Sequence, residues 1–246
     1  MAGKSDPEKS FDRIVPSERW VRAQFMGEYV VDSKRPILVW EHNKYPTYFF
    51  PREDVRMDLL EEAAQTNNRT FWNLTVNGSQ VERAAFHYPN HRELEGYITL
   101  QWHKMDHWFE EAEEVFVHAR DPFKRVDVMP SSRHVRVEID GVTVAETKLP
   151  SLLFETSLPT RYYIPALDVN MDYLTPTDSH TQCPYKGTAS YWTVTINDKP
   201  YKDLVWCYPD PIPECPKIEG LLCFFNEKVD LYVDGELQER PKTFWS

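Results

Sequence analysis

The sequence has little of what most metal-binding and nucleic-acid-binding proteins depend on. It contains four cysteines, Cys183, Cys207, Cys215 and Cys223, and no two of them form a C-x-x-C pair. The usual spacing of a zinc knuckle is therefore missing. Lys and Arg number 28 against 39 Asp and Glu, for a net charge of −11, which leaves no excess of positive charge to displace counterions from a polyanion. We expect no structural metal and no nucleic-acid partner.

Long apolar runs are also missing. No segment approaches the ~20 consecutive apolar residues of a transmembrane helix, and residues 1–10 lack the apolar segment of a signal peptide. We therefore expect a cytoplasmic protein with reduced thiols and no membrane partner. Residues 1–19 are predicted to form a disordered tail, whereas a hydrophobic content of 41% is typical of a globular remainder.

The chain repeats itself. Residues 27–33 resemble residues 141–147, an offset of 141 − 27 = 114, and a later offset of 191 − 71 = 120 carries residues 71–76 onto residues 191–196. The matched single residues are Glu41 with Glu155, Pro51 with Pro165, Asp54 with Asp168, and Tyr88 with Tyr208. We predict two tandem repeats, at residues 20–120 and 133–246, with a linker at residues 121–132.

Each repeat has the pattern of β structure. Apolar and charged residues alternate through residues 135–139, and Asp140-Gly141 and Asn77-Gly78 are typical hairpin turns. Helical periodicity is weak, and only residues 53–64 have room for a turn or two. The sequence thus predicts a mainly β protein made of two small domains with short helical turns.

The chemically richest stretch is residues 181–192. It brings a thiol, an amine, hydroxyls and aromatic rings together around Pro184 and Gly187, which favour a turn. Residues 189–196 then read as a strand. A reactive loop at the end of a strand is a reasonable place for a site.

Three stretches carry a resemblance to a known family. They are Tyr-Tyr-Ile-Pro at residues 162–165, Thr-x-Cys-Pro-Tyr-Lys-Gly-x-Ala-Ser-Tyr-Trp at residues 181–192, and Trp-x-Tyr-Pro-x-Pro at residues 206–211. They resemble the family called domain of unknown function 427, which also carries the label nucleotidyltransferase. The resemblance covers nearly the whole chain as a tandem protein. It implies a β-tent fold similar to the Mss4-like group, whose zinc-binding cysteine pairs this chain lacks.

The two repeats differ where the chemistry is concentrated. The first repeat has residues 61–70 in place of the Cys-Pro-Tyr-Lys-Gly loop and carries neither its thiol nor its amine. We expect one repeat with a site, the second, and one that supports it or has changed its ligand.

The candidate residues in the second repeat each have a structural alternative. Cys183 and Lys186 are the candidate catalytic pair, because a cation lowers the pKa of a nearby thiol; the alternative for Cys183 is a buried, inert thiol. Lys186 also suits a phosphate or carboxylate ligand. The candidate ligand-binding residues are Glu155, Tyr162, Tyr163, Thr181, Tyr185, Tyr191, Trp206 and Tyr208. Glu155 has the alternative of a structural hydrogen-bond partner, and the aromatic residues that of core packing.

Three functions remain open at this point. The first is a small-molecule-binding protein or enzyme with its pocket in the second repeat. The second is a nucleotidyltransferase, although no compact set of carboxylates for Mg²⁺ is evident. The third is a non-catalytic module for protein interaction. The sequence identifies no cofactor, and it leaves the oligomeric state open, a homodimer included.

Overall fold

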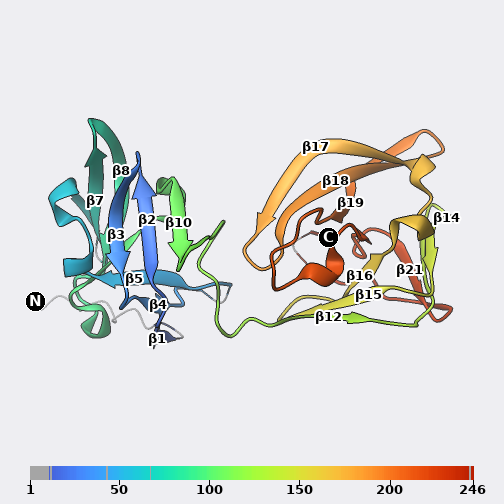
Figure 1. The fold of residues 1–246 in the computed structure, drawn as a ribbon, viewed down its shortest axis with the longest axis horizontal. Coiled ribbons are helices and arrows are strands. Elements are labelled where there is room, and N and C mark those ends of the chain that lie inside the picture. The colour runs from blue at the N-terminus through green and yellow to red at the C-terminus, as the bar shows by residue number, and fades with distance from the viewer. Residues whose placement is uncertain (1–10, 12, 43, 67, 244) are drawn as a thin grey trace, which may run out of the picture. The chain divides into compact units, whose positions relative to one another are not determined.

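The computed structural model describes residues 11, 13–42, 44–66, 68–243 and 245–246. These fall into two compact units, residues 1–121 and residues 122–246 (Figure 1), called the first half and the second half below. Of the disordered tail expected at residues 1–19, residues 1–10 and residue 12 lie outside the part of the chain that the structure describes. Residues 14–16 belong to the first strand.

The first half contains a seven-stranded and a four-stranded antiparallel sheet. The larger sheet has the order β1 (Ile14–Pro16), β4 (Ile37–Val39), β5 (Thr47–Pro51), β9 (Tyr97–Leu100), β8 (Ser79–His87), β7 (Thr70–Val76) and β6 (Leu60–Gln65). The smaller sheet has the order β11 (Glu113–Glu114), β10 (His107–Glu110), β2 (Val21–Phe25) and β3 (Glu28–Ser33).

The second half repeats this arrangement strand for strand. Its larger sheet has the order β12 (Val126–Pro130), β15 (Ser151–Glu155), β16 (Arg161–Ile164), β20 (Leu222–Phe224), β19 (Lys199–Cys207), β18 (Gly187–Ile196) and β17 (Leu174–Cys183). Its smaller sheet has the order β14 (Val142–Thr147), β13 (Val135–Ile139), β21 (Asp230–Val233) and β22 (Glu236–Leu237). The identical strand order confirms the predicted mainly β fold in two similar halves.

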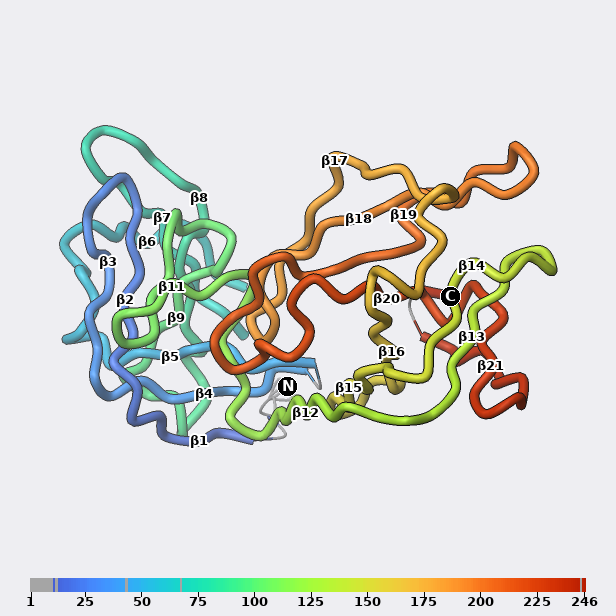
Figure 2. Tube along the Cα trace, turned by 45° about the vertical axis from the view of Figure 1, so that its right-hand side comes forward, coloured from blue at the N-terminus to red at the C-terminus, as the bar shows by residue number. Residues whose placement is uncertain are grey.

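The larger sheet of the second half is strongly bent. In Figure 1, β17, β18 and β19 lie at the top of this half and β12, β15 and β16 at the bottom. Figure 2 shows the smaller sheet, with β13, β14 and β21, to one side of the bent sheet. The bend leaves the two ends of the sheet facing one another, so that side chains from distant strands can meet.

Helical structure is confined to single 3₁₀ turns in the described residues. They are η1 (Arg52–Asp54), η2 (Met57–Leu59), η3 (Arg92–Leu94), η4 (Trp102–Lys104), η5 (Ala166–Asp168), η6 (Met171–Tyr173) and η7 (Pro216–Ile218). Residues 53–64, which had room for helix, form parts of two such turns followed by β6. No described helix has the length and apolar character needed to cross a bilayer.

The two halves use the same local devices. Asn77 and Asp140 adopt left-handed backbone conformations with φ of 51° and 48°, each followed by a glycine in the same region, which closes the predicted hairpins. The Ser33 hydroxyl donates to Asp54 at 2.7 Å, and the Thr147 hydroxyl donates to Asp168 at 2.6 Å. Asp54 and Asp168 therefore fasten the 3₁₀ turn to the smaller sheet in each half.

Each half has two hydrophobic clusters. In the second half the larger cluster includes Val135, Ile164 and Val194, and the smaller one includes Tyr163, Trp206 and Tyr208. Neighbouring residues of β16, Tyr162 and Tyr163, pack against different clusters, because successive side chains of a strand point to opposite faces. The smaller cluster is the one beside the Cys-Pro-Tyr-Lys-Gly turn.

Strand β17 forms one edge of its sheet. Its pairing with β18 is interrupted by an irregularity between Pro176 and His180. Within that irregularity the hydroxyls of Thr177 and Ser179 donate to the two carboxylate oxygens of Asp203, at 2.7 Å and 2.8 Å. This polar bulge shapes the long hairpin that carries the candidate site.

Candidate functional site

The hairpin of β17 and β18 reaches further than its counterpart. In the first half the pairing of β6 with β7 ends at Gln65 and Thr70. In the second half the pairing continues past the matching level through Thr181–Ala189, Gln182–Thr188 and Cys183–Gly187. The Lys186 N–H then donates to the Cys183 carbonyl at 3.3 Å. The sequence motif is therefore the tight tip of an extended hairpin.

Lys186 turns from this tip toward the opposite end of the bent sheet. Its Nζ donates to Oε2 of Glu155, the last residue of β15, at 2.5 Å. Lys124 approaches the other oxygen, with its Nζ 3.0 Å from Glu155 Oε1 and 5.3 Å from the centre of the Tyr185 ring. Two ammonium groups thus share one carboxylate, and we call these three residues the Lys–Glu–Lys cluster.

The cluster is buried and charged. The side chains of Glu155 and Lys186 are 5% and 10% exposed. Burial disfavours the carboxylate of Glu155, but Lys186 and Lys124 together hold its pKa below the ordinary value. Burial likewise disfavours the Lys186 ammonium, yet the Cys183 sulfur and the Glu155 carboxylate raise its pKa. With two amino groups against one carboxylate, the cluster has one cationic side chain more than it has anionic ones.

Gly187 allows the hairpin tip to pack against the chain that follows β19. Its φ is +103°, and a Cβ on it would lie 3.1 Å from the Asp210 carbonyl oxygen and 3.4 Å from the Ile212 nitrogen. The Ile212 N–H also donates to the Lys186 carbonyl at 3.2 Å. The backbone from the Lys186 carbonyl to Gly187 is therefore held in place by residues 210–212.

We expect Gly187→Ala to destabilise the second half by roughly 2–3 kcal/mol, because it adds a backbone clash to the strain of a left-handed conformation. Gly141→Ala is the matched control, since Gly141 has a φ of +78° with nothing within 4 Å. Its cost should be limited to about 1 kcal/mol of conformational strain. Urea unfolding of both variants measures the difference, and equal losses would show that residues 210–212 adapt to the new methyl group.

Most of the other predicted residues belong either to the hairpin tip or to the buried aromatic rings of the smaller hydrophobic cluster. Cys183 is half-buried and packs with Tyr191 against the smaller hydrophobic cluster. The Thr181 and Tyr191 hydroxyls are hydrogen-bonded to one another at 2.7 Å. Tyr163, Trp206 and Tyr208 are buried beneath this layer, where burial raises the pKa of both phenols. These three rings act as a floor, with the polar groups of the tip above them.

Tyr162 does not join this group. It packs instead against the larger hydrophobic cluster on the other face of β16. The remaining thiols are also core residues, since burial raises the pKa of Cys207 and Cys215 to about 11 and of Cys223 to about 12. Among the four cysteines, Cys183 is the only one that is not fully buried.

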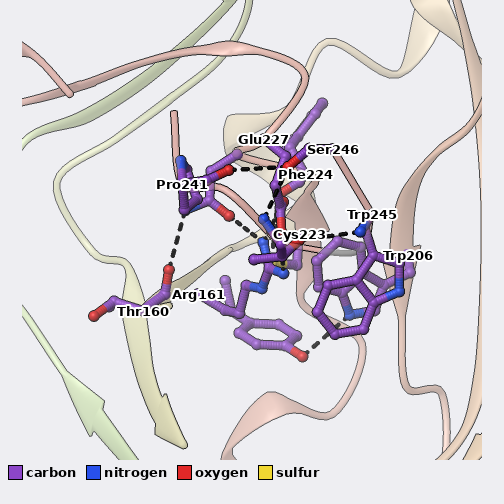
Figure 3. Close-up of polar contacts among 12 residues, drawn as sticks. Thr160, Arg161, Trp206, Cys223, Phe224, Glu227, Pro241, Trp245 and Ser246 are labelled. Atoms are coloured by element: carbon purple, nitrogen blue, oxygen red, sulfur yellow. Dashed lines mark hydrogen bonds and ion pairs between the residues drawn. The ribbon is translucent and has the colours of Figure 1, made fainter. Parts of the chain in front are cut away.

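A second buried ion pair adjoins the floor of the site. Arg161 donates from both terminal nitrogens to the carboxylate of Glu227, at 2.6 Å and 2.7 Å. Figure 3 shows Trp206 and Trp245 beside this pair, and their ring centres lie 5.5 Å and 5.3 Å from the guanidinium carbon. The Trp206 indole in turn donates to the Tyr163 hydroxyl at 3.2 Å. Through its contact with Trp206, Arg161 helps to hold the buried aromatic rings in position.

Sequence reasoning missed Lys124 and the Arg161–Glu227 pair. Lys124 belongs to the segment predicted to be a linker, and it reaches Glu155 because the following strand, β12, pairs with β15 and places Val126 opposite Glu155. Arg161 directly precedes the Tyr-Tyr-Ile-Pro stretch, and an arginine beside such a stretch was a usable signal. Within the described ranges no three His, Cys, Asp or Glu side chains are grouped closely enough to share a metal ion.

The comparison with protein families agrees with the division of the chain into two similar halves. A model of the family described as domain of unknown function (DUF427) matches residues 13–111 and again residues 127–235. The two matches cover most of the chain, one in each half, and the chain therefore belongs to this family as a tandem protein. No curated protein matches the chain at a significant level.

Proposed function

We propose that the second half binds a small anionic molecule at the tip of the β17–β18 hairpin. The observation that carries this proposal is the Lys–Glu–Lys cluster, in which two ammonium groups face one carboxylate in a largely buried setting. One positive charge is left over, and an anion would neutralise it. Lys124 is the accessible member, with 21% of its side chain exposed.

The surrounding residues suit a small ligand with an apolar part. Tyr185 lies against Lys124, and Thr181, Tyr191 and Cys183 line the same hairpin tip. Small-molecule sites commonly combine aromatic walls with a few fixed polar groups. Carboxylates and phosphates on a compact apolar body are the ligand class that this combination favours.

We expect Lys186→Ala to weaken the binding of benzoate by about 1.5–3 kcal/mol, the range for a charge-assisted hydrogen bond. Isothermal titration with benzoate and inorganic phosphate measures the effect. Lys199→Ala is the matched control, because Lys199 is an exposed lysine of the same half that pairs with Asp140. It should leave both affinities unchanged.

Two outcomes would contradict the proposal. One is benzoate and phosphate both failing to bind to the unaltered protein, and the other is equal loss of affinity in the two lysine variants. Titration with ATP in the presence and absence of Mg²⁺ adds a further arm. Binding of ATP that requires Mg²⁺ would favour the nucleotidyltransferase alternative, because that chemistry holds its triphosphate through the metal.

A further inference from the structure

The first half contains a cluster that corresponds to the Lys–Glu–Lys cluster but differs in chemistry. Arg69, at the tip of the β6–β7 hairpin, donates from Nη2 to Glu41 Oε1 at 2.8 Å. Its Nε and Nη2 also donate to the Tyr88 hydroxyl, at 3.0 Å and 2.6 Å, and that hydroxyl donates to Glu41 Oε1. The guanidinium lies over Phe86, 4.4 Å from the ring centre. We call Glu41, Arg69 and Tyr88 the Arg–Glu–Tyr cluster.

This cluster keeps polar atoms that the protein itself does not use. Among the described residues, Arg69 Nη1 donates no hydrogen bond and Glu41 Oε2 accepts none. The side chains are partly open, with Arg69 31% and Glu41 12% exposed. In the second half, by contrast, both oxygens of Glu155 are occupied by lysines.

A buried histidine beside the cluster is a separate observation that points the same way. His91 is 7% exposed, and its Nδ1 is buried without a hydrogen-bond partner among the residues that the structure describes. Its ring lies 6.5 Å from that of Tyr88 and 4.8 Å from that of Phe11, centre to centre. A buried polar atom without a partner is costly in a folded protein, so a polar partner that reached this nitrogen would stabilise the first half.

The charges of the two clusters select different ligands. The first half has one cation on one carboxylate, a net charge of zero, whereas the second half has two cations on one carboxylate. An anion would be repelled by the open oxygen of Glu41, and a cation by Arg69. A neutral molecule with one acceptor for Nη1 and one donor for Oε2 satisfies both atoms without an unpaired charge.

We propose that the Arg–Glu–Tyr cluster is a second binding site, for neutral planar molecules that carry an amide-type edge. The amide carbonyl accepts from Arg69 Nη1, and the amide N–H donates to Glu41 Oε2. The aromatic rings of Phe11, Tyr88 and His91 pack against one another beside the cluster and form its apolar surroundings, which favour a ligand with a flat apolar body. This site is independent of the anion site proposed for the second half.

Benzamide and benzoate form a matched pair of probes, because they share a ring and differ in charge and in the amide donor. Ligand-observed NMR should detect benzamide binding to the unaltered protein in the millimolar range, as expected of a fragment. Arg69→Lys should weaken it roughly tenfold or more, because lysine keeps the charge on Glu41 but lacks the second donor nitrogen. The second half already uses a lysine in the equivalent role, so the variant should fold, and a thermal melt checks this.

Arg83→Lys is the control, since Arg83 also lies over a phenylalanine of the first half, Phe71, at 5.3 Å. It should bind benzamide as the unaltered protein does. Absence of benzamide binding, or equal loss in Arg69→Lys and Arg83→Lys, would overturn the proposal. Loss of benzamide binding in Lys186→Ala would assign the ligand to the second half, and loss of benzoate binding in Arg69→Lys would show that the first half takes anions; either result also overturns it.

Discussion

Replacing Glu227 by Ala should lower the free energy of unfolding of the second half by about 3–5 kcal/mol, the range for breaking a buried ion pair. The Glu227 side chain is 0% exposed and that of Arg161 is 8% exposed, so the substitution leaves a buried guanidinium without its carboxylate. Burial opposes that charge, and Glu227 is the partner that keeps the pKa of Arg161 raised. The loss should appear in urea unfolding as an earlier transition of this half alone.

The control for this prediction is Arg240→Ala, which breaks an exposed pair with Asp230, with side chains 52% and 39% exposed. Its cost should stay within about 1 kcal/mol. The double substitution Arg161→Met with Glu227→Leu should recover a large part of the loss, because it removes both charges together. If Glu227→Ala unfolded at the same urea concentration as Arg240→Ala, the buried Arg161–Glu227 ion pair would contribute no more to stability than the exposed pair does.

Replacing Glu155 by Gln should destabilise the second half by about 3 kcal/mol at pH 7, because it leaves two neighbouring ammonium groups without a counter-charge. The effect should depend on pH in a defined direction. The folded-state pKa of Glu155 lies below the ordinary value of 4.5. A lowered pKa gives stability that is fully present above about 4.5 and is lost as the pH falls through the folded-state value.

The measurement is the difference in unfolding free energy between the unaltered protein and Glu155→Gln across this range. The difference should be largest near neutral pH and should close below about pH 4.5, while other carboxylates titrate in both proteins and cancel. Glu146→Gln serves as the control, because Glu146 is 52% exposed in its pair with His134. A Glu155→Gln difference that persisted unchanged at acid pH would rule out the carboxylate charge as its source.

The fold followed from the sequence because its signals are local. Asp140-Gly141 and Asn77-Gly78 specify their turns directly, and alternation through residues 135–139 specifies β13 and its buried face. Because the two repeats match in sequence, a structural prediction made for one repeat also applies to the other, as the equivalent hydrogen bonds of Asp54 and Asp168 illustrate. Residues 53–64 were harder, since two 3₁₀ turns and a strand leave no single period to detect.

The site could be predicted only where its residues are close in sequence or matched between the repeats. Lys186 stood out in its motif, and Glu155 stood out because Glu41 matches it. Lys124 carries no such signal, since its meeting with Glu155 depends on the pairing of β12 with β15, and the two residues are about 30 positions apart in the chain with no motif that links them. Arg69 was missed as an equivalent of Lys186 because hairpins of different length deliver the two cations to the same place.

The bulge in β17 has a consequence for the protein at high concentration. A ten-residue strand at the edge of a sheet offers a row of unpaired N–H and C=O groups to any other chain. Pro176 removes one donor from that row, and the irregularity up to His180, with Thr177 and Ser179 tied to Asp203, breaks its spacing. The same hairpin that presents Lys186 therefore has an edge with irregular spacing and one donor fewer, and both features disfavour pairing with a strand of another chain.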